Sequence, residues 1–235
     1  MTAFRPRICA LQLYCTEVTL ADPNLVIAKI VLRNKGPHAI SKLDWSILDT
    51  LNLRLANNPS LLCNGLSLSP NQSHEFQLSF AVQNICVPQK LRGTFSYMMS
   101  QEDGMVPDKV DVSLLFPCIT YTSPATLSRD AFTDLLSGAD MPAKFNLRCP
   151  VVDSFDTILA KICFYGHFSV VEKVDSSASL YSQTIQSHPI CLLVKQQGSD
   201  FVTVDGKTTD SQLLQNVCEE IKSLISSSAE ETNCS

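Results

Sequence analysis

The segment ILAKICFYGHFSVVEKV, residues 158–174, contains the point at which the hydrophobic pattern of the chain changes from helical to extended. Before Gly166, apolar side chains recur at intervals of three and four residues, as they do on one face of an amphipathic helix. After Gly166, apolar and polar side chains alternate, as they do in a strand with one buried face. Because glycine commonly ends helices, the segment predicts a helix followed by a strand of an antiparallel sheet.

The rest of the second half repeats these two patterns. Residues 128–138 and 209–226 have helical periodicity, with Ser128 and Asp210 as candidate N-caps and Gly138 as a stop signal. Period-two alternation predicts four strands, at residues 167–174, 177–185, 189–196 and 200–206. Helices packed on an antiparallel sheet make this half an α+β domain.

The first half consists of short segments with period-two alternation. In HEFQLSFAV, residues 74–82, every second side chain is apolar. Similar segments lie at residues 8–15, 25–34, 42–48, 51–55, 91–99 and 109–116. About seven strands separated by Pro, Asn and Gly turns are typical of an immunoglobulin-like β-sandwich. Trp45 lies at an alternating position and is expected in its core.

We therefore expect two domains, an immunoglobulin-like sandwich at 1–119 and an α+β domain at 120–235. Their charges differ: residues 1–120 carry ten basic and nine acidic side chains, and 121–235 carry eight and fourteen, for a net charge of −5. Neither half has the clustered Lys and Arg that neutralise phosphates, so no nucleic acid and no anionic lipid surface is expected as a direct partner. No apolar run approaches the ~18 residues of a spanning helix.

Cys163 lies four positions before His167 and suggests one enzymatic alternative, a cysteine-dependent enzyme that uses Cys163 with His167 or His188. A nucleophilic thiol needs a lowered pKa, whereas the apolar helix face that contains Cys163 would raise it. Packing is therefore the favoured interpretation. The ten cysteines are dispersed without a CxxC pair, which is typical of a reducing cytosol and offers no zinc-ligand spacing.

No catalytic residues, metal ligands or cofactor-binding loops are predicted, so the chain is expected to be a protein-binding module rather than an enzyme. Aromatic side chains are frequent at protein interfaces, and Phe164, Tyr165 and Phe168 form a cluster in the sequence.

Four segments of the second half closely resemble the carboxy-terminal ear, or appendage, of the delta large subunit of adaptor protein complex 3. They cover most of residues 128–226 and read LLSG, LAKICF, HFSVVEKVDSSASLYSQTIQSHPICLLVK and VTVDGKTTDSQLLQNVCEEIKSLI. The first half is similar in kind, because adaptor ears consist of an immunoglobulin-like sandwich followed by a platform of antiparallel sheet and helices.

The resemblance implies a non-enzymatic module of a vesicle coat that needs no cofactor. The family's complex is cytoplasmic, peripheral on Golgi and endosomal membranes, and sorts membrane cargo toward lysosomes and related organelles. The implied partners are the other subunits of the complex, the small sigma subunit among them, and accessory proteins. An ear that contacts only subunits of its own complex is a further alternative.

Ears of the plasma-membrane clathrin adaptors hold peptides in a platform groove centred on a tryptophan. The single tryptophan of this chain, Trp45, lies in the sandwich half, so the same groove is not expected. If the platform binds a peptide, its aromatic and basic residues are the candidate contacts. These protein-binding candidates are Phe164, Tyr165, His167, Phe168 and Lys195.

Overall fold

The computed structural model describes residues 11–22, 24–47, 53–56, 63–198 and 200–226, which divide into two compact units. The first contains the described residues up to Gln83 together with Gln89–Phe116. The second contains Asn84–Pro88 and the described residues from Pro117 onward. Asn84–Pro88, from the first half of the sequence, thus belongs to the second unit. The division into domains at 1–119 and 120–235 stays a prediction.

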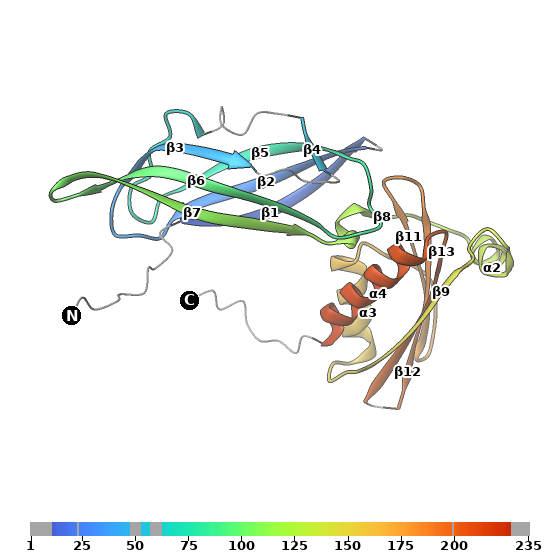
Figure 1. The fold of residues 1–235 in the computed structure, drawn as a ribbon. Helices are drawn as coiled ribbons and strands as arrows, with labels where there is room; N and C mark the ends of the chain where they lie inside the picture. The colour runs from blue at the N-terminus through green and yellow to red at the C-terminus, as the bar shows by residue number, and fades with distance from the viewer. Residues whose placement is uncertain (1–10, 23, 48–52, 57–62, 199, 227–235) are drawn as a thin grey trace. The chain divides into compact units, whose positions relative to one another are not determined.

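The first unit is a sandwich of two antiparallel sheets (Figure 1). One sheet has the order β1-β2-β5-β4 and the other β3-β6-β7, which is the arrangement of a constant-type immunoglobulin domain. The strands are β1 (Leu11–Asp22), β2 (Leu25–Asn34), β3 (Ile40–Ile47), β4 (Leu53–Leu55), β5 (Ser73–Val82), β6 (Gln89–Gln101) and β7 (Gly104–Phe116). The predicted seven strands are confirmed, although residues 8–10, 48 and 51–52 lie outside the described part.

Trp45 lies at the centre of the sandwich core, as predicted, with none of its side chain exposed. Its ring stacks on Phe95 with 4.8 Å between centroids and meets Phe76 edge to face at 5.5 Å. Gly93 on β6 leaves room for this indole. A Cβ at Gly93 would lie 2.5 Å from Trp45 Nε1 and 2.7 Å from the carbonyl oxygen of Ser46.

Replacing Gly93→Ala is expected to destabilise the sandwich by about 1–3 kcal/mol, because the added methyl must displace either the indole or the backbone of β3. Denaturant unfolding followed by Trp45 fluorescence measures this loss. Ser96→Ala, at an exposed position of the same strand, is the matched control and should change stability by less than about 0.5 kcal/mol. Equal stability of the two variants would contradict the packing argument.

The second unit is built on one antiparallel sheet with the strand order β10-β11-β12-β13-β9. A short strand, β8 (Thr122–Pro124), pairs with β11 beyond the end of β10. The strands are β9 (Ala143–Pro150), β10 (Ser169–Val174), β11 (Ser177–Thr184), β12 (Pro189–Gln197) and β13 (Phe201–Thr208). The four predicted strands are confirmed, and β9 is an additional strand at the sheet edge.

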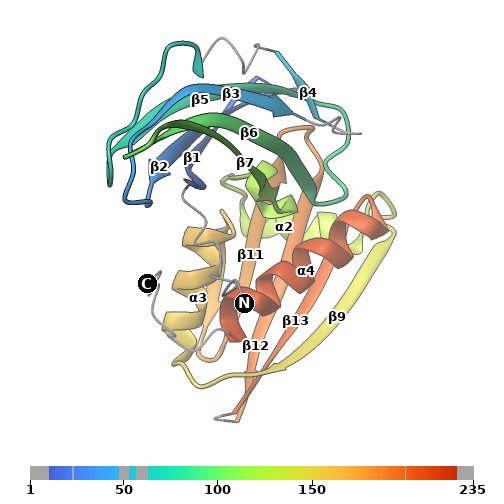
Figure 2. The same ribbon diagram turned by 60° about the vertical axis from the view of Figure 1, so that its left-hand side comes forward.

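Helices cover the two faces of this sheet unequally. Both α3 (Phe155–Tyr165) and α4 (Ser211–Ser226) pack on one face, where the predicted apolar stripes of both helices enter the core. The shorter α2 (Arg129–Ser137) lies on the opposite face (Figures 1 and 2). The four-residue 3-10 helix η1 (Cys118–Tyr121) precedes β8.

The predicted helix ends are confirmed by hydrogen bonds. The Ser128 side chain accepts a hydrogen bond from the Ala131 N–H, and Asp210 Oδ1 accepts from the N–H groups of Gln212 and Leu213, both at 2.9 Å. Helix α3 ends at Tyr165, with Gly166 as its C-cap. The left-handed residue of the turn into β10 is His167, with φ 57°.

The carboxylate of Glu220 on α4 holds the start of η1. Its Oε1 accepts from the Cys118 N–H at 2.7 Å, and its Oε2 accepts from the Ile119 N–H at 2.9 Å. These are two of the donors that a helix start leaves without an intrahelical partner. The carboxylate is half-buried, and desolvation raises the pKa of Glu220 above its ordinary value despite the lowering effect of these hydrogen bonds.

The raised pKa predicts the pH dependence of stability. A carboxyl whose pKa is higher in the folded state contributes its full stabilisation below the unfolded-state pKa and loses it as pH rises through the folded-state pKa. The stability of the wild type minus that of Glu220→Gln should therefore fall as pH rises from the ordinary glutamate pKa upward. Denaturant unfolding over a pH series measures the difference. A difference that grows with pH would contradict it, and Glu219→Gln controls for the loss of a charge on α4.

Candidate functional site

The face of the second unit's sheet that lies opposite α3 and α4 is only partly covered. Helix α2 covers one end of it, where Phe132 packs with Tyr181 and Cys191. Lys207 donates a hydrogen bond to the carbonyl oxygen of Leu136 and so ties the last turn of α2 to β13. Beyond α2, the sheet face is open to solvent.

Strand register places the exposed side chains of this face in rows that cross the strands. Paired residues in antiparallel strands point to the same side of the sheet. The central open row is therefore Glu172, Ser179, Leu193, Asp205 and Asn146, from β10 to β9. The row farther from α2 is Val174, Ser177, Lys195, Thr203 and Arg148.

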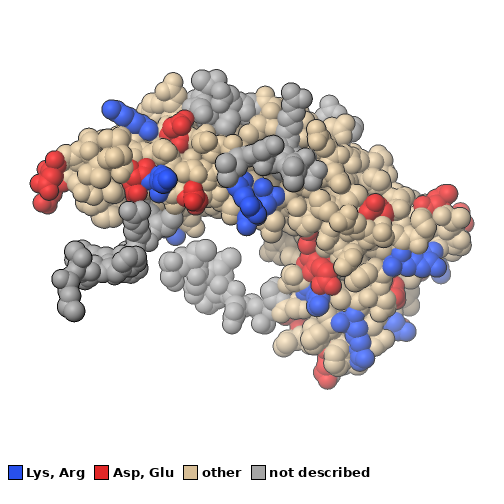
Figure 3. Space-filling model, viewed as in Figure 1, with Lys and Arg blue, Asp and Glu red and all other residues tan. Residues whose placement is uncertain are grey.

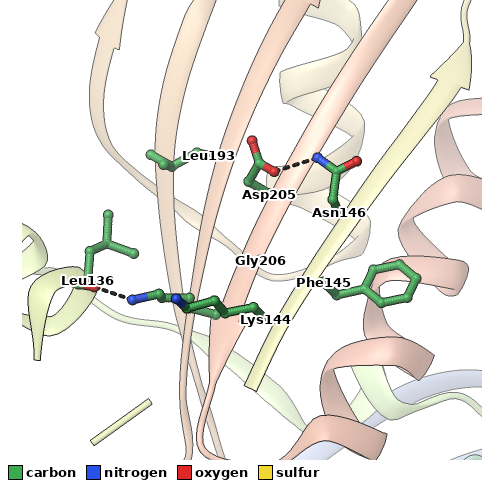
Figure 4. A pocket seen from close by; sticks show the side chains of 8 residues that line it. Leu136, Lys144, Phe145, Asn146, Leu193, Asp205 and Gly206 are labelled. Atoms are coloured by element: carbon green, nitrogen blue, oxygen red, sulfur yellow. Dashed lines mark hydrogen bonds between the residues drawn. The ribbon is translucent and has the colours of Figure 1, made fainter. Parts of the chain in front are cut away.

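Two hollows lie along the central row. The first, of about 450 Å³, is lined by Leu136, Lys144, Asn146, Leu193, Asp205 and Lys207, with backbone from Phe145 and Gly206. Figure 4 shows Leu193 beside the Asp205–Asn146 pair, while the ring of Phe145 points to the other side of the sheet. The second, of about 290 Å³, includes Glu172, Ser179 and Lys195.

The two hollows are adjacent, because Leu193 and Asp205 line both, and we call them together the platform groove. It crosses five strands. At ~4.8 Å between neighbouring strands, these span about 19 Å, the length of five or six residues of extended chain. Leu193, with 38% of its surface exposed, lies at the middle of this length.

Charges in the platform groove are paired unequally. Both carboxylates have partners: Asp205 accepts a hydrogen bond from Asn146 Nδ2 at 2.5 Å, and Glu172 forms an ion pair with Arg129 at 3.1 Å. Within the described residues, the ammonium groups of Lys144 and Lys195 have no hydrogen-bond or ion-pair partner. The groove therefore presents an apolar centre between two unpaired positive charges.

The five predicted protein-binding residues do not form one site. Lys195 lies in the platform groove. Phe164 and Tyr165 lie at the end of α3, on the other side of the sheet, with 73% and 56% of their surfaces exposed. Their rings contact each other edge to face at 4.9 Å.

His167 and Phe168 have structural surroundings. His167 Nδ1 lies 3.1 Å from the carbonyl oxygen of Ile119, and the His167 carbonyl accepts a hydrogen bond from Ser182 Oγ at 2.8 Å. The histidine thus connects η1, the α3–β10 turn and β11. Phe168 is 2% exposed and belongs to the core under α3 and α4, so its ring cannot contact a partner in this conformation.

The thiol-enzyme alternative finds no support in the geometry. Cys163 packs against the core, and burial raises the pKa of its thiol. His188 Nδ1 lies 2.6 Å from Thr209 Oγ1, and no described hydrogen bond joins Cys163 to His188 or His167. Among the residues that the structure describes, no three His, Cys, Asp or Glu side chains are grouped to hold a metal ion.

Cys163 is expected to react slowly with iodoacetamide at neutral pH, because its raised pKa leaves little thiolate. Its labelling rate, measured by mass spectrometry on the folded protein, should lie below that of a free cysteine in a peptide and rise with pH. Unfolding in denaturant should remove the difference. Labelling faster than the peptide would restore the thiol-enzyme alternative.

No helix in the described part of the chain is long and apolar enough to cross a bilayer.

On the face drawn in Figure 3, basic and acidic side chains are interspersed in each unit, without a broad field of one sign.

Comparisons with known proteins find matches to the second unit and to most of the chain. The family described as AP3 Mu C-terminal domain matches residues 119–226, nearly all of the second unit. The AP-3 complex subunit delta-1 of Bos taurus is 39% identical over 214 residues, which cover 89% of this chain. The chain belongs to the AP-3 delta appendage family. It spans only 18% of the length of the bovine subunit.

Two solved structures have weaker likeness to this AP-3 appendage. The GAE domain of yeast GGA1 is 18% identical with a TM-score of 0.35, over 45% of this chain and 90% of that one. A protein of unknown function from Porphyromonas gingivalis is 12% identical with a TM-score of 0.25, over 84% and 83%. TM-scores this low do not establish a common fold, so the family rests on the sequence matches.

Proposed function

We propose that this AP-3 appendage is a non-enzymatic interaction module that recruits other proteins to an adaptor coat, and that the platform groove is its principal docking surface. The observation that carries the proposal is an open groove with an apolar centre in a chain that is 39% identical to an adaptor subunit. Pockets with a few convergent polar groups are the usual binding sites of such modules.

The proposed partners are other subunits of the AP-3 complex, including the small sigma subunit, and accessory proteins of the coat. The module would act in the cytoplasm, on Golgi and endosomal membranes, as part of the complex that sorts cargo toward lysosomes. The resemblance of residues 128–226 to delta ears supports these assignments.

We propose the Phe164–Tyr165 pair as a second contact surface. Two large aromatic rings that pack on each other and remain mostly exposed are typical of an interface rather than of a free surface. His167 and Phe168 would support this surface from beneath by fixing the turn after α3, and Lys195 would act in the platform groove.

A photo-crosslinking amino acid placed at position 193 is expected to link the chain to AP-3 subunits or coat accessory proteins in cells. The same amino acid at position 164 tests the second surface. Mass spectrometry identifies the linked proteins.

Position 215 on α4, where Gln215 is exposed outside both surfaces, is the matched control. Links from position 215 equal to those from 193 would show that capture is not specific to the groove. Links from 193 only to proteins unrelated to vesicle transport would overturn the proposed function.

A further inference from the structure

Resting on the proposed function, we propose that the platform groove binds an extended acidic peptide that places one aliphatic or aromatic side chain on Leu193 and carboxylates toward Lys144 and Lys195. The occupant is a segment of a partner protein.

The apolar part of the proposal follows from the position of Leu193. Leu193 and Asp205 line both hollows. Leu193 is partly exposed, and its neighbours in the central row are polar. A single large apolar side chain of the peptide can therefore be desolvated there, whereas two adjacent ones would meet Ser179 or Asp205. Buried anchors of this kind contribute most of the binding energy of small interfaces.

The acidic part follows from the pairing of charges. Because Asp205 and Glu172 already have partners, a basic peptide would have to compete with Asn146 and Arg129 for them. The ammonium groups of Lys144 and Lys195 have no such partner within the described residues and would repel a basic peptide. The hydrogen bond from Asn146 leaves the negative charge of Asp205 in place, but three lysines, Lys144, Lys195 and Lys207, line the groove against two carboxylates. The groove therefore has a net positive charge in a half of the chain that carries fourteen acidic and eight basic side chains.

The spacing of carboxylates follows from strand register. Lys195 is two positions after Leu193 on β12, about 7 Å along the strand. Lys144 is two strands away, about 10 Å across, and on the side of the central row nearer α2. Because an extended chain rises ~3.4 Å per residue, carboxylates within about two or three residues of the anchor can reach both lysines.

The test uses this chain and three fluorescein-labelled peptides of about ten residues, with fluorescence anisotropy as the readout. The first peptide has a central leucine among glutamates, the second has serine in place of the leucine, and the third has lysines in place of the glutamates. The first should bind at least about tenfold more tightly than either of the others, and its affinity should fall as salt rises.

Charge reversal in the chain tests the two lysines. Lys144→Glu and Lys195→Glu should each weaken binding of the acidic peptide by about five- to tenfold. The double variant should bind the lysine peptide more tightly than the wild type does, a gain that misfolding could not produce. Lys222→Glu on α4, which packs on the opposite face of the sheet, is the matched control and should leave binding unchanged.

Several outcomes overturn the inference. The acidic and lysine peptides could bind equally well, or the acidic peptide could still bind the variant with both lysines reversed. The chain could also self-associate in a way that Lys195→Glu abolishes, which would make a second copy the occupant. If position 193 crosslinks to coat proteins but the acidic peptide does not bind, this inference fails and the proposed function stands. If position 193 does not crosslink to coat proteins and the acidic peptide does not bind, this inference and the proposed function both fail.

Discussion

The second unit depends on one constraint: its sheet can bury only one face under α3 and α4. In each strand, alternate side chains point to opposite faces, so residues such as Leu192 and Val204, which fill the core, require that Leu193 and Asp205 face away from it. The nine-residue α2 is too short to cover the whole opposite face. The platform groove is the part of that face left open.

The same constraint determines which charges remain available. Near α2, Lys207 is held by the carbonyl oxygen of Leu136, so it anchors the helix. The cross-strand partner of Lys207 on β9, Lys144, has no such contact among the described residues. Farther from α2, the carboxylates of Asp205 and Glu172 are paired and the ammonium group of Lys195 is not. Lysines on the same face of the sheet therefore have different roles, because their neighbours differ.

Much of the fold could be predicted from local pattern. The stripe on 155–163, the stop at Gly166 and the caps at Ser128 and Asp210 are interactions within one helix or turn, which sequence spacing encodes directly. The strand β9 also carries a period-two signal, with Ala143, Leu147 and Cys149 buried. This strand is not among the predicted ones, and proline, which is more typical of turns and strand edges, precedes it at Pro142 and is its last residue at Pro150.

The candidate site could be predicted only in part. Lys195 was singled out as a basic platform residue, but Leu193, Lys144 and Asp205 were not, and Phe168 proved to be core. Phe164 and Phe168 are four positions apart, yet the turn at His167 separates an exposed helix end from a buried strand start. Aromatic character alone does not distinguish these two environments.

By itself, the sequence determined the order of sandwich and platform, the identity of most elements and the membership of an adaptor family, since these are expressed in periodicity, capping and residue identity along the chain. Only the tertiary structure decided where the proposed docking groove lies. A groove that crosses five strands is made of residues from β9 to β13 that meet through backbone pairing between distant segments. Strand register is a long-range property, and one sequence read locally does not specify it.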